Sequence, residues 1–323
     1  MYFKQNLVNS TVTDIESLSM RHSGTLRQCY DRDTNIYLSI PYSHDDDVIM
    51  ERRYKTASKL AWKLMNYGYT VFSPITHSHP LENVVGERRG HDFWMSQDLP
   101  YLTRNWAGLV VLVKAAGWRE SSGVSRELEV ADVKGIPIEA VDPLEVMTVV
   151  GISGKKRSGK DTMADMFVEK GFERHAFADP IKKAGKIIFN LSDEQVDGDR
   201  KEEMDPYWER TPREIMQHFG TDAFRETYGE EIWVDSLIQR LRLRLPSHAV
   251  VKDVRFPNEV EGLQERAGAD VIRIDASERL DHDDDHASET ALDGYDGFDR
   301  TIRNNGTLAE FKDGSRAIAE QYL

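Results

Sequence analysis

The sequence predicts an α/β protein of two domains, each built on a parallel β-sheet with helices on both faces. Three observations predict it. Short apolar runs alternate with segments in which apolar residues recur at helical spacing, which is typical of strand–helix–strand units. The chain has 323 residues, more than one ordinary domain contains. Finally, Pro143 interrupts one strand pattern shortly before another begins at Thr148, and we place the domain boundary there.

The composition argues against several classes of protein. The formal net charge of −14 argues against a broad basic surface, so we expect neither stable nucleic-acid binding nor attachment to an anionic membrane. The single cysteine, Cys29, allows no intrachain disulfide and no thiolate metal cluster. No apolar run approaches the roughly 20 residues that span a bilayer, and the polar N-terminus lacks the core of a signal peptide. We therefore expect a soluble, cytoplasmic protein.

Strand and helix patterns alternate through the N-terminal domain, which we assign to residues 35–143. Residues 1–34 are polar and weakly periodic, so we interpret them as an extension. Strands are expected at residues 36–40, 70–72, 107–113 and 136–141. Helices are expected at residues 51–67, 92–102 and 125–134. Ligands bind beyond the carboxyl ends of parallel strands, so the loops after the first three strands should face one crevice.

The segment 73–90 is expected to be a long loop beside this crevice. It carries Pro74 and Pro80, and it is longer than an ordinary connector in an α/β unit. It also carries His77 and His79, which could bind a metal. Because no acidic partners accompany them at fixed spacing, we favour contacts of these histidines with a base or a phosphate.

The C-terminal domain, assigned to residues 147–323, repeats the alternation. Strands are expected at residues 148–150, 175–177, 249–251, 270–274 and near 302. Helices are expected at residues 163–168, 181–189, 211–226, 233–245, 258–267 and from 308 onward. The segment 197–203 is highly charged, and the acidic, glycine-bearing segment 277–299 is expected to be a loop.

A glycine-rich loop at residues 151–162 joins the first strand of this domain to a helix. Gly154 and Gly159 can adopt backbone angles that other residues avoid, which lets consecutive N–H groups converge on a phosphate. Lys160 would add a cation. The pattern G-x-x-x-x-G-K-[S/T] fits except at its last place, where an aspartate stands and Thr162 comes one residue late. The alternative interpretation is a plain glycine-rich turn.

Two carboxyl groups in the N-terminal domain could carry chemistry in the crevice. Glu127 is expected in the first turn of a helix, where terminal N–H groups would keep it ionised. An ionised carboxylate directed at a sugar C1′ is a nucleophile for glycosidic cleavage, and a second carboxyl group such as Asp98 can handle the proton. The alternative is that Glu127 is only a helix-terminal acid and that Asp98 is solvated.

Four stretches of this domain then carry a resemblance to a known family. They are residues 37–44, 71–80, 92–94 and 117–127. They resemble a phage-borne family of uncharacterised domains, which is similar to a branch of the nucleoside 2-deoxyribosyltransferase and deoxynucleoside 5′-monophosphate N-glycosidase superfamily. The resemblance covers about residues 36–138 and implies a flavodoxin/Rossmann-like, doubly wound parallel sheet. It also makes a homo-oligomer an expectation, because neighbouring subunits often complete such crevices.

The resemblance assigns roles residue by residue. Glu127 matches the nucleophile, and Asp98 matches the acid that positions or protonates the base. Tyr37 and Ser39 match first-strand residues that bind substrate. The loop that receives the 5′-phosphate matches Ser122, Gly123 and Ser125. The two histidines have no counterpart in the characterised enzymes.

Six stretches of the C-terminal domain carry a second resemblance. They are residues 158–162, 178–180, 211–214, 220–222, 233–234 and 253–259. Together they resemble the deoxynucleoside monophosphate kinases of bacteriophages over essentially the whole domain, and this implies a P-loop NTPase fold of three α/β/α layers. The form Ser-Gly-Lys-Asp-Thr of the loop is itself a trait of that family. The acidic run 281–286 invites a metal interpretation, but residues 286–289 echo the family and favour a lid or substrate loop.

This second resemblance implies ATP and Mg²⁺ as cofactors and a deoxynucleoside monophosphate as substrate. The residues implied in binding the ATP phosphates are Gly154, Lys155, Arg157, Ser158, Gly159, Lys160, Asp161 and Thr162, of which Asp161 and Thr162 would also face Mg²⁺. The residues implied around the monophosphate are Asp179, Lys182, Arg213, Asp253, Arg255 and Glu259. Lys160 and Arg255 are the expected catalytic cations, since phosphoryl transfer needs positive charge beside the phosphates. The planar guanidinium groups of Arg213, Arg225 and Arg255 also suit the geometry of phosphate.

We therefore expect a bifunctional enzyme of deoxynucleotide metabolism. One domain would cleave, or transfer the sugar of, a deoxynucleoside 5′-monophosphate, and the other would phosphorylate such a monophosphate. If the protein is phage-encoded, it should act in the cytoplasm of the infected cell. Two alternatives are that the N-terminal domain senses nucleotides without cleaving them, and that the kinase acts on modified bases within DNA.

Overall fold

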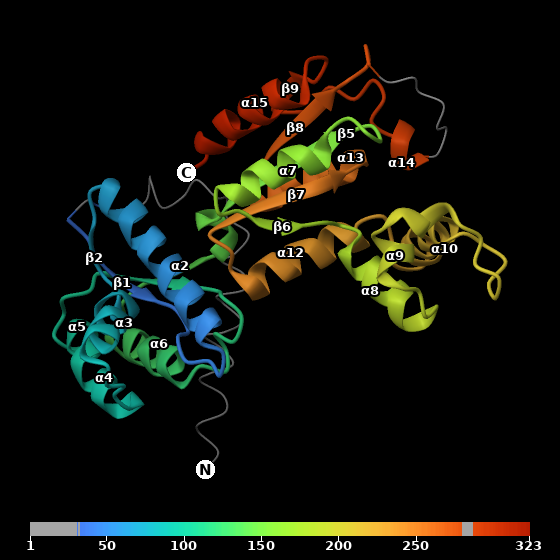
Figure 1. Cartoon of the computed structure of the whole chain (residues 1–323). Coiled ribbons are helices and arrows are strands. Elements are labelled where there is room, and N and C mark those ends of the chain that lie inside the picture. The colour runs from blue at the N-terminus through green and yellow to red at the C-terminus, as the bar shows by residue number, and fades with distance from the viewer. Residues whose placement is uncertain (1–30, 32, 280–286) are drawn as a thin grey trace. The chain divides into compact units, whose positions relative to one another are not determined.

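The computed structural model describes residues 31, 33–279 and 287–323 (Figure 1). Most of the extension expected at residues 1–34, and all of the acidic run 281–286, lie outside the described residues. The chain divides into two compact units, of which the first comprises residues 1–147 and 242–247 and the second comprises residues 148–241 and 248–323. Among the described residues, no helix combines the length and apolar character needed to cross a membrane.

The first unit contains a parallel sheet, as expected. Its strands are β1 (Asn35–Ser39), β2 (Thr70–Phe72), β3 (Leu109–Val113) and β4 (Ile138–Val141). Their order is β2-β1-β3-β4, and every neighbouring pair is parallel. Because β1 and β3 lie side by side at the centre, the loops that follow them emerge at the same edge of the sheet.

Helices cover both faces of this sheet. They are α2 (Asp47–Asn66), α3 (Pro74–Val85), α4 (His91–Asp98), α5 (Pro100–Thr103) and α6 (Ser122–Lys134), with a 3₁₀ turn at Pro143–Val146. Side chains alternate along β1, so Leu38 packs in the cluster that contains Leu60 of α2, whereas Tyr37 packs in the cluster that contains Leu128 of α6. The doubly wound arrangement follows from this alternation.

Two expectations for this unit are wrong. The segment 73–90 is not a long loop, because α3 occupies most of it. Pro74 stands at the start of that helix, where its missing N–H costs no hydrogen bond, and Gly86 ends the helix at φ 73°. Helix α6 begins three residues earlier than expected, with the Ser121 hydroxyl accepting from the N–H of Val124 as its N-cap.

The second unit contains a five-stranded parallel sheet. Its strands are β5 (Thr148–Gly154), β6 (Glu173–His175), β7 (His248–Val254), β8 (Asp270–Asp275) and β9 (Arg300–Arg303). The order is β6-β7-β5-β8-β9, so the strand that leads into the glycine-rich loop is central. The carboxyl ends of β5 and β7 therefore bring the glycine-rich loop and the segment after Val254 to one edge.

Helical segments surround this sheet. They are α7 (Lys160–Glu169), α8 (Asp179–Ile188), α9 (Asp193–Val196), η3 (Asp199–Glu202), α10 (Pro212–Gln217), η4 (His218–Arg225), α11 (Glu226–Tyr228), α12 (Ile232–Arg244), α13 (Pro257–Ala267), α14 (Ala287–Thr290) and α15 (Leu308–Glu320). The single helix expected at 211–226 is instead three consecutive segments, of which η4 is a π-helix. The loop expected at 277–299 contains the short helix α14.

The core of the second unit has the three layers expected of an α/β/α sandwich. Helices α7 and α15 contribute Phe167 and Phe311 to a cluster that also contains Ile152 and Ile272 of the sheet. On β5, Gly151 allows close approach to α13, because a Cβ there would lie 3.1 Å from the side chain of Leu263. The glycine-rich loop is thus supported by helices and by both neighbouring strands.

Candidate functional site

The glycine-rich loop has a backbone that requires its two glycines. Gly154 has φ 154° and Gly159 has φ 110°. A Cβ on Gly154 would lie 2.4 Å from the Ser158 hydroxyl, and one on Gly159 would lie 2.7 Å from the Asn304 amide. The Lys160 ammonium donates to the carbonyls of Gly154, at 2.5 Å, and Lys155, at 2.7 Å. Burial lowers the pKa of Lys160 to about 8, and the charge of Arg255 acts in the same direction.

A cavity of about 290 Å³ opens beside this loop. Its cationic lining residues are Lys160, Lys182, Lys201, Arg213, Arg225, Lys252 and Arg255. Its acidic lining residues are Asp161, Asp253 and Glu259. The remaining wall is mostly apolar and includes Phe177, Ile181 and Trp233. In a chain of net charge −14, seven cations around one cavity concentrate positive potential there, and this suits an anion that carries an apolar, planar group.

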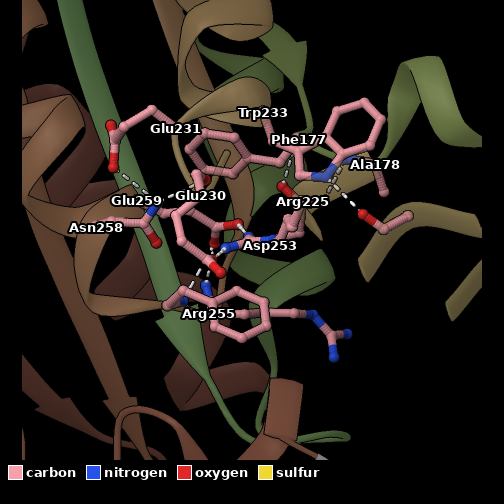
Figure 2. A network of polar contacts seen from close by, with 12 residues as sticks. Phe177, Ala178, Arg225, Glu230, Glu231, Trp233, Asp253, Arg255, Asn258 and Glu259 are labelled. Atoms are coloured by element: carbon pink, nitrogen blue, oxygen red, sulfur yellow. Dashed lines mark hydrogen bonds and ion pairs between the residues drawn. The ribbon is translucent and has the colours of Figure 1, made fainter. Parts of the chain in front are cut away.

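A network of hydrogen bonds joins residues that line this cavity, as Figure 2 shows. Asp253 accepts from the N–H groups of Phe177, at 2.8 Å, and Ala178, at 3.0 Å. Glu259 accepts from the Arg225 guanidinium at 2.8 Å and from the N–H of Arg255 at 2.8 Å. The side chains of Arg225 and Glu259 are only 5% and 4% exposed, so their opposite charges neutralise each other inside the protein.

A second candidate site lies in the first unit, where a buried carboxylate receives two hydroxyl groups. The hydroxyl of Tyr37 donates to Glu127 Oε1 at 2.8 Å, and that of Ser39 donates to Oε2 at 2.5 Å. Glu127 is 6% exposed and Asp98 is 3% exposed. Asp98 Oδ1 has no hydrogen-bond partner within the described part of the chain. Both acids are therefore shielded from solvent, and such an environment perturbs the ionisation of a carboxyl group.

Burial perturbs both of these carboxyl groups. It raises the pKa of Asp98 to about 7. It also raises the pKa of Glu127 to about 7, against the lowering effect of the hydrogen bonds from Ser39 and Tyr37, and the charge of Asp98 raises that pKa further. Burial thus brings the pKa of each carboxyl group near neutral pH, and the charge of Asp98 acts on Glu127.

Aromatic side chains adjoin this carboxyl pair. Phe72 stacks on Tyr101 with ring centroids 3.6 Å apart and planes 11° apart, and the ring of Tyr37 lies 5.7 Å from Phe72. The exposed His77 ring lies 6.0 Å from Phe72 and 6.3 Å from Trp94. Flat apolar groups beside a carboxyl pair are suited to holding a nucleobase.

Comparison with known proteins identifies the second unit. The sequence profile described as deoxynucleotide monophosphate kinase matches residues 148–207 and 200–314, which together make up more than half of the chain. The chain belongs to the deoxynucleotide monophosphate kinase family. Residues 34–143 match a further profile, described as a domain of unknown function, DUF1937. Both matches agree with the resemblances that the sequence carries to viral kinases and to an uncharacterised domain.

Two viral relatives in this kinase family match this chain over most of their own length. The chain is 36% identical to a candidate deoxynucleotide monophosphate kinase of Acanthamoeba polyphaga mimivirus, over 51% of this chain and 92% of the relative. It is 24% identical to the deoxynucleoside-5′-monophosphate kinase of Escherichia phage T5, over 45% of this chain and 84% of the relative. Among solved structures, the dephospho-CoA kinase from Campylobacter jejuni matches with a TM-score of 0.33 and 13% identity, over 55% of this chain and 98% of that chain.

The kinase cavity gathers five of the six residues expected around the monophosphate and two of the eight expected at the ATP phosphates. Lys160, Asp161, Lys182, Arg213, Asp253, Arg255 and Glu259 all line the cavity. Asp179 does not line it, because its carboxylate accepts from the N–H of Ala176 at 2.9 Å and from Arg240 at 3.1 Å. The carboxylates of Asp253 and Glu259 are occupied by protein N–H groups, which favours a supporting role over direct contact with substrate.

Within the kinase loop, one expected phosphate contact is engaged elsewhere, because the Lys155 ammonium pairs with Asp293 at 2.5 Å. The carbonyl of Arg157 accepts from Arg279 at 3.0 Å, which leaves the role of the Arg157 side chain a prediction. Asp161 pairs with Lys252 at 2.6 Å, and although burial raises its pKa, the contact with Lys252 leaves that pKa lowered overall. An ionised Asp161 next to the half-buried Thr162 provides the oxygen ligands that Mg²⁺ prefers.

Sequence reasoning missed two cations of the kinase cavity, Lys201 and Lys252. Lys201 lies in the segment 197–203, whose sequence shows only a high density of charge. Lys252 interrupts the apolar residues of β7 directly before Asp253, and a cation at the carboxyl end of a predicted parallel strand was the available signal. Their contribution depends on which loops meet at that edge, which no local pattern states.

In the first unit, three interpretations are corrected. Glu127 lies beyond the first turn of α6, so helix-terminal N–H groups do not hold it ionised; the alternative of a solvated Asp98 is also wrong, because that residue is buried. His79 is occupied by the protein, since its ring nitrogens contact Tyr42 at 2.7 Å and Glu51 at 3.0 Å. These contacts make His79 a packing residue between α3 and α2.

The residues expected to receive a 5′-phosphate lie in the first turns of α6. Ser122 and Ser125 are exposed, and Gly123 is half-buried. A Cβ on Gly123 would lie 3.8 Å from the ring of His91, which is ordinary contact. The three residues thus lie at a helix N-terminus, where N–H groups favour anions, and their role stays a prediction.

Proposed function

We propose that the second unit transfers the γ-phosphoryl group of ATP to the 5′-phosphate of a deoxynucleoside monophosphate. One observation carries this proposal: a single cavity joins Lys160 and Asp161 of the glycine-rich loop to cations that come from separate segments, including Lys182, Arg213 and Arg255. Phosphoryl transfer between two nucleotides requires such a concentration of positive charge, and membership of the kinase family supports the assignment.

The chemistry is mainly positioning and charge stabilisation. Lys160 offsets the charge of the phosphates held by the loop, while Arg255 and Arg213 stabilise negative charge that spreads over the transferring group. The attacking phosphate oxygen is already anionic, so no general base is needed. Mg²⁺, when bound beside Asp161 and Thr162, supplies further neutralisation of phosphate charge. The apolar wall formed by Phe177, Ile181 and Trp233 would hold the nucleobase.

A product assay tests this function directly. The full chain is incubated with ATP, Mg²⁺ and each of dAMP, dCMP, dGMP and dTMP, and the products are separated by anion-exchange chromatography. We expect a deoxynucleoside diphosphate and ADP in equal amounts from at least one monophosphate. Absence of diphosphate with all four would contradict the proposal, and parallel reactions with AMP and GMP measure the preference for deoxyribose.

The crowding around Gly159 gives a further prediction. We expect Gly159→Ala to weaken ATP binding by about tenfold or more, because the new Cβ would lie 2.7 Å from Asn304 and 2.8 Å from Phe311. Gly171→Ala is the matched control, since φ there is 91° but nothing lies within 4 Å of the Cβ. Titration with a fluorescent ATP analogue measures both variants. Equal weakening by the two substitutions, or none, would contradict the prediction.

We also propose that the first unit cleaves the N-glycosidic bond of a deoxynucleoside 5′-monophosphate. The supporting observation is the Glu127 carboxylate, which Tyr37 and Ser39 hold through hydrogen bonds while Asp98 lies buried nearby. In this reaction Glu127 forms a bond to C1′ as the bond from C1′ to the base breaks. The base takes the electron pair and a proton from Asp98. Water, or a second base in a transfer reaction, then forms a bond to C1′ and gives its proton to the Asp98 carboxylate, as the bond from C1′ to Glu127 breaks.

The surroundings of the two acids support one placement of the proton. Glu127 accepts two O–H groups, which favour its ionised form. Asp98 is buried, and its Oδ1 accepts nothing from the described residues, which favours the protonated form. Near pH 7 the pair should therefore carry one proton, on Asp98. This is the state that glycosidic cleavage requires, with one nucleophile and one acid.

A pH profile tests this assignment. We expect base release to follow a bell-shaped curve with its maximum near pH 7, because the rate rises as Glu127 loses its proton and falls as Asp98 loses its own. Asp98→Asn should lower the rate about 10²- to 10⁴-fold and remove the alkaline fall. Chromatography of free base from pH 5 to 9 provides the measurement. Persistence of the alkaline fall in the variant would assign the acid to another group.

A further inference from the structure

Glu289, in helix α14, is a buried acid that neither proposed reaction uses. Its side chain is 4% exposed. Oε2 accepts from the N–H of Lys156 in the glycine-rich loop at 2.7 Å, and Oε1 accepts from Arg255 Nη1 at 2.5 Å. One carboxylate therefore joins the loop that we assign to the ATP phosphates to an arginine that lines the cavity.

This placement has an electrostatic cost that calls for a reason. A carboxylate close to a phosphate-binding loop repels the phosphates, and it also raises the pKa of Lys160, the opposite of the effect of Arg255. A buried carboxylate is tolerated only when charged or N–H partners satisfy it, and Glu289 has both kinds. We therefore ask which function of the contacts with Lys156 and Arg255 outweighs the repulsion between the Glu289 carboxylate and bound phosphates.

Anchoring of α14 to the loop does not by itself require this carboxylate. The backbone carbonyl of Glu289 accepts from the Lys155 ammonium at 2.6 Å, and Asp293 pairs with the same ammonium at 2.5 Å. These contacts fasten the segment to the loop. The carboxylate of Glu289 adds a direct connection to the guanidinium of Arg255.

We propose that Glu289 is a positioning residue, which fixes the Arg255 guanidinium relative to the glycine-rich loop. The inference rests on the proposed kinase function of the second unit. An arginine has several rotatable bonds, and a guanidinium that is already oriented loses less freedom when it contacts the transferring phosphoryl group. Glu289 thus acts through Arg255 and needs no contact with substrate.

The expected result is a selective loss of turnover. Glu289→Gln keeps the size of the side chain but replaces the charged contact with Arg255 by a neutral one. We expect kcat for diphosphate formation to fall about 10- to 100-fold, while KM for ATP changes by less than about threefold. Asp293→Asn is the matched control, because it weakens the anchoring of the same segment without touching Arg255, and kcat should stay within about threefold of wild type.

A double-mutant cycle with Arg255→Lys separates positioning from a merely structural role. Lysine cannot present the planar fork, so in that background Glu289→Gln should change kcat by much less than in the wild type. Independent, multiplicative effects of the two substitutions would overturn the proposal, as would an unchanged kcat in the single variant. If Glu289→Gln does not fold, judged by circular dichroism, the same cycle is measured with Glu289→Asp.

The same assays distinguish a failure of the role of Glu289 from a failure of the proposed kinase function. All assays use the full chain with ATP, Mg²⁺ and the four deoxynucleoside monophosphates. A wild-type protein that makes no diphosphate from any of them contradicts the kinase proposal itself. An active wild type with an unaffected Glu289→Gln variant contradicts only the role of Glu289.

Discussion

Lys160→Met is expected to reduce diphosphate formation by about 10²- to 10³-fold or more. The Lys160 ammonium already lies within the glycine-rich loop, where it donates to two loop carbonyls, and it lines the cationic cavity. Methionine retains most of the length of the side chain but removes the charge that would offset the phosphates in the transition state. The measurement is steady-state production of diphosphate from the monophosphate that the wild type uses best.

Lys156→Met is the matched control for this substitution. Lys156 belongs to the same loop, but its side chain is 43% exposed and its ammonium lies 3.6 Å from Glu202. We expect its activity to stay within about threefold of wild type, since exposed ion pairs contribute little. Comparable losses in the two variants would indicate that general loop charge, not the position of Lys160, supports catalysis. Base release should be unchanged in both variants, because Glu127 belongs to the other unit.

Glu127→Gln is expected to lower base release by at least about 10³-fold and to leave diphosphate formation unchanged. The amide cannot form the bond to C1′, although it can still contact the hydroxyl groups of Tyr37 and Ser39. Liquid chromatography of free base from each deoxynucleoside 5′-monophosphate provides the measurement. A second base added to parallel reactions reveals whether the sugar is transferred or hydrolysed.

Glu129→Gln is the control for that variant, since Glu129 lies on the same helix with its side chain 63% exposed and paired with Arg126. We expect it to behave as the wild type. The Glu127→Gln variant also distinguishes cleavage from nucleotide sensing. Full base release by Glu127→Gln would contradict the nucleophile assignment. A nucleotide sensor would be favoured if the wild-type protein releases no base but changes its own kinase activity when it binds a monophosphate.

The elements that sequence reasoning placed well are those that carry their signal locally. Strands such as Thr70–Phe72 and Asp270–Asp275 are short apolar runs bounded by turn residues, so their positions need no tertiary information. The glycine-rich loop was recognisable for the same reason, since the positive φ of Gly159 restricts which residues can stand there. By contrast, Pro74 and Pro80 predicted a loop where α3 forms, because proline at a helix start costs nothing and α3 accommodates Pro80 in its interior.

The properties of the candidate sites depend on partners that lie far apart along the chain. Tyr37 and Glu127 are 90 residues apart, and Lys156 and Glu289 are 133 residues apart. No local pattern states that such pairs meet, or that a carboxyl group is buried on meeting its partner. The sequence also gave no reason to prefer a packing role for His79, whose partners come from two helices and from Tyr42.

The sequence by itself determined an α/β fold with parallel sheets, a glycine-rich loop between a strand and a helix, and the identity of the acids and cations available for chemistry. Those features follow from the spacing of apolar residues and from the backbone freedom of glycine, both of which are local. Only the tertiary structure decided which cations share one cavity and which carboxyl groups lose water and have their pKa raised toward 7. Burial and electrostatic interaction depend on distances in space, and the folding of distant segments against one another sets those distances.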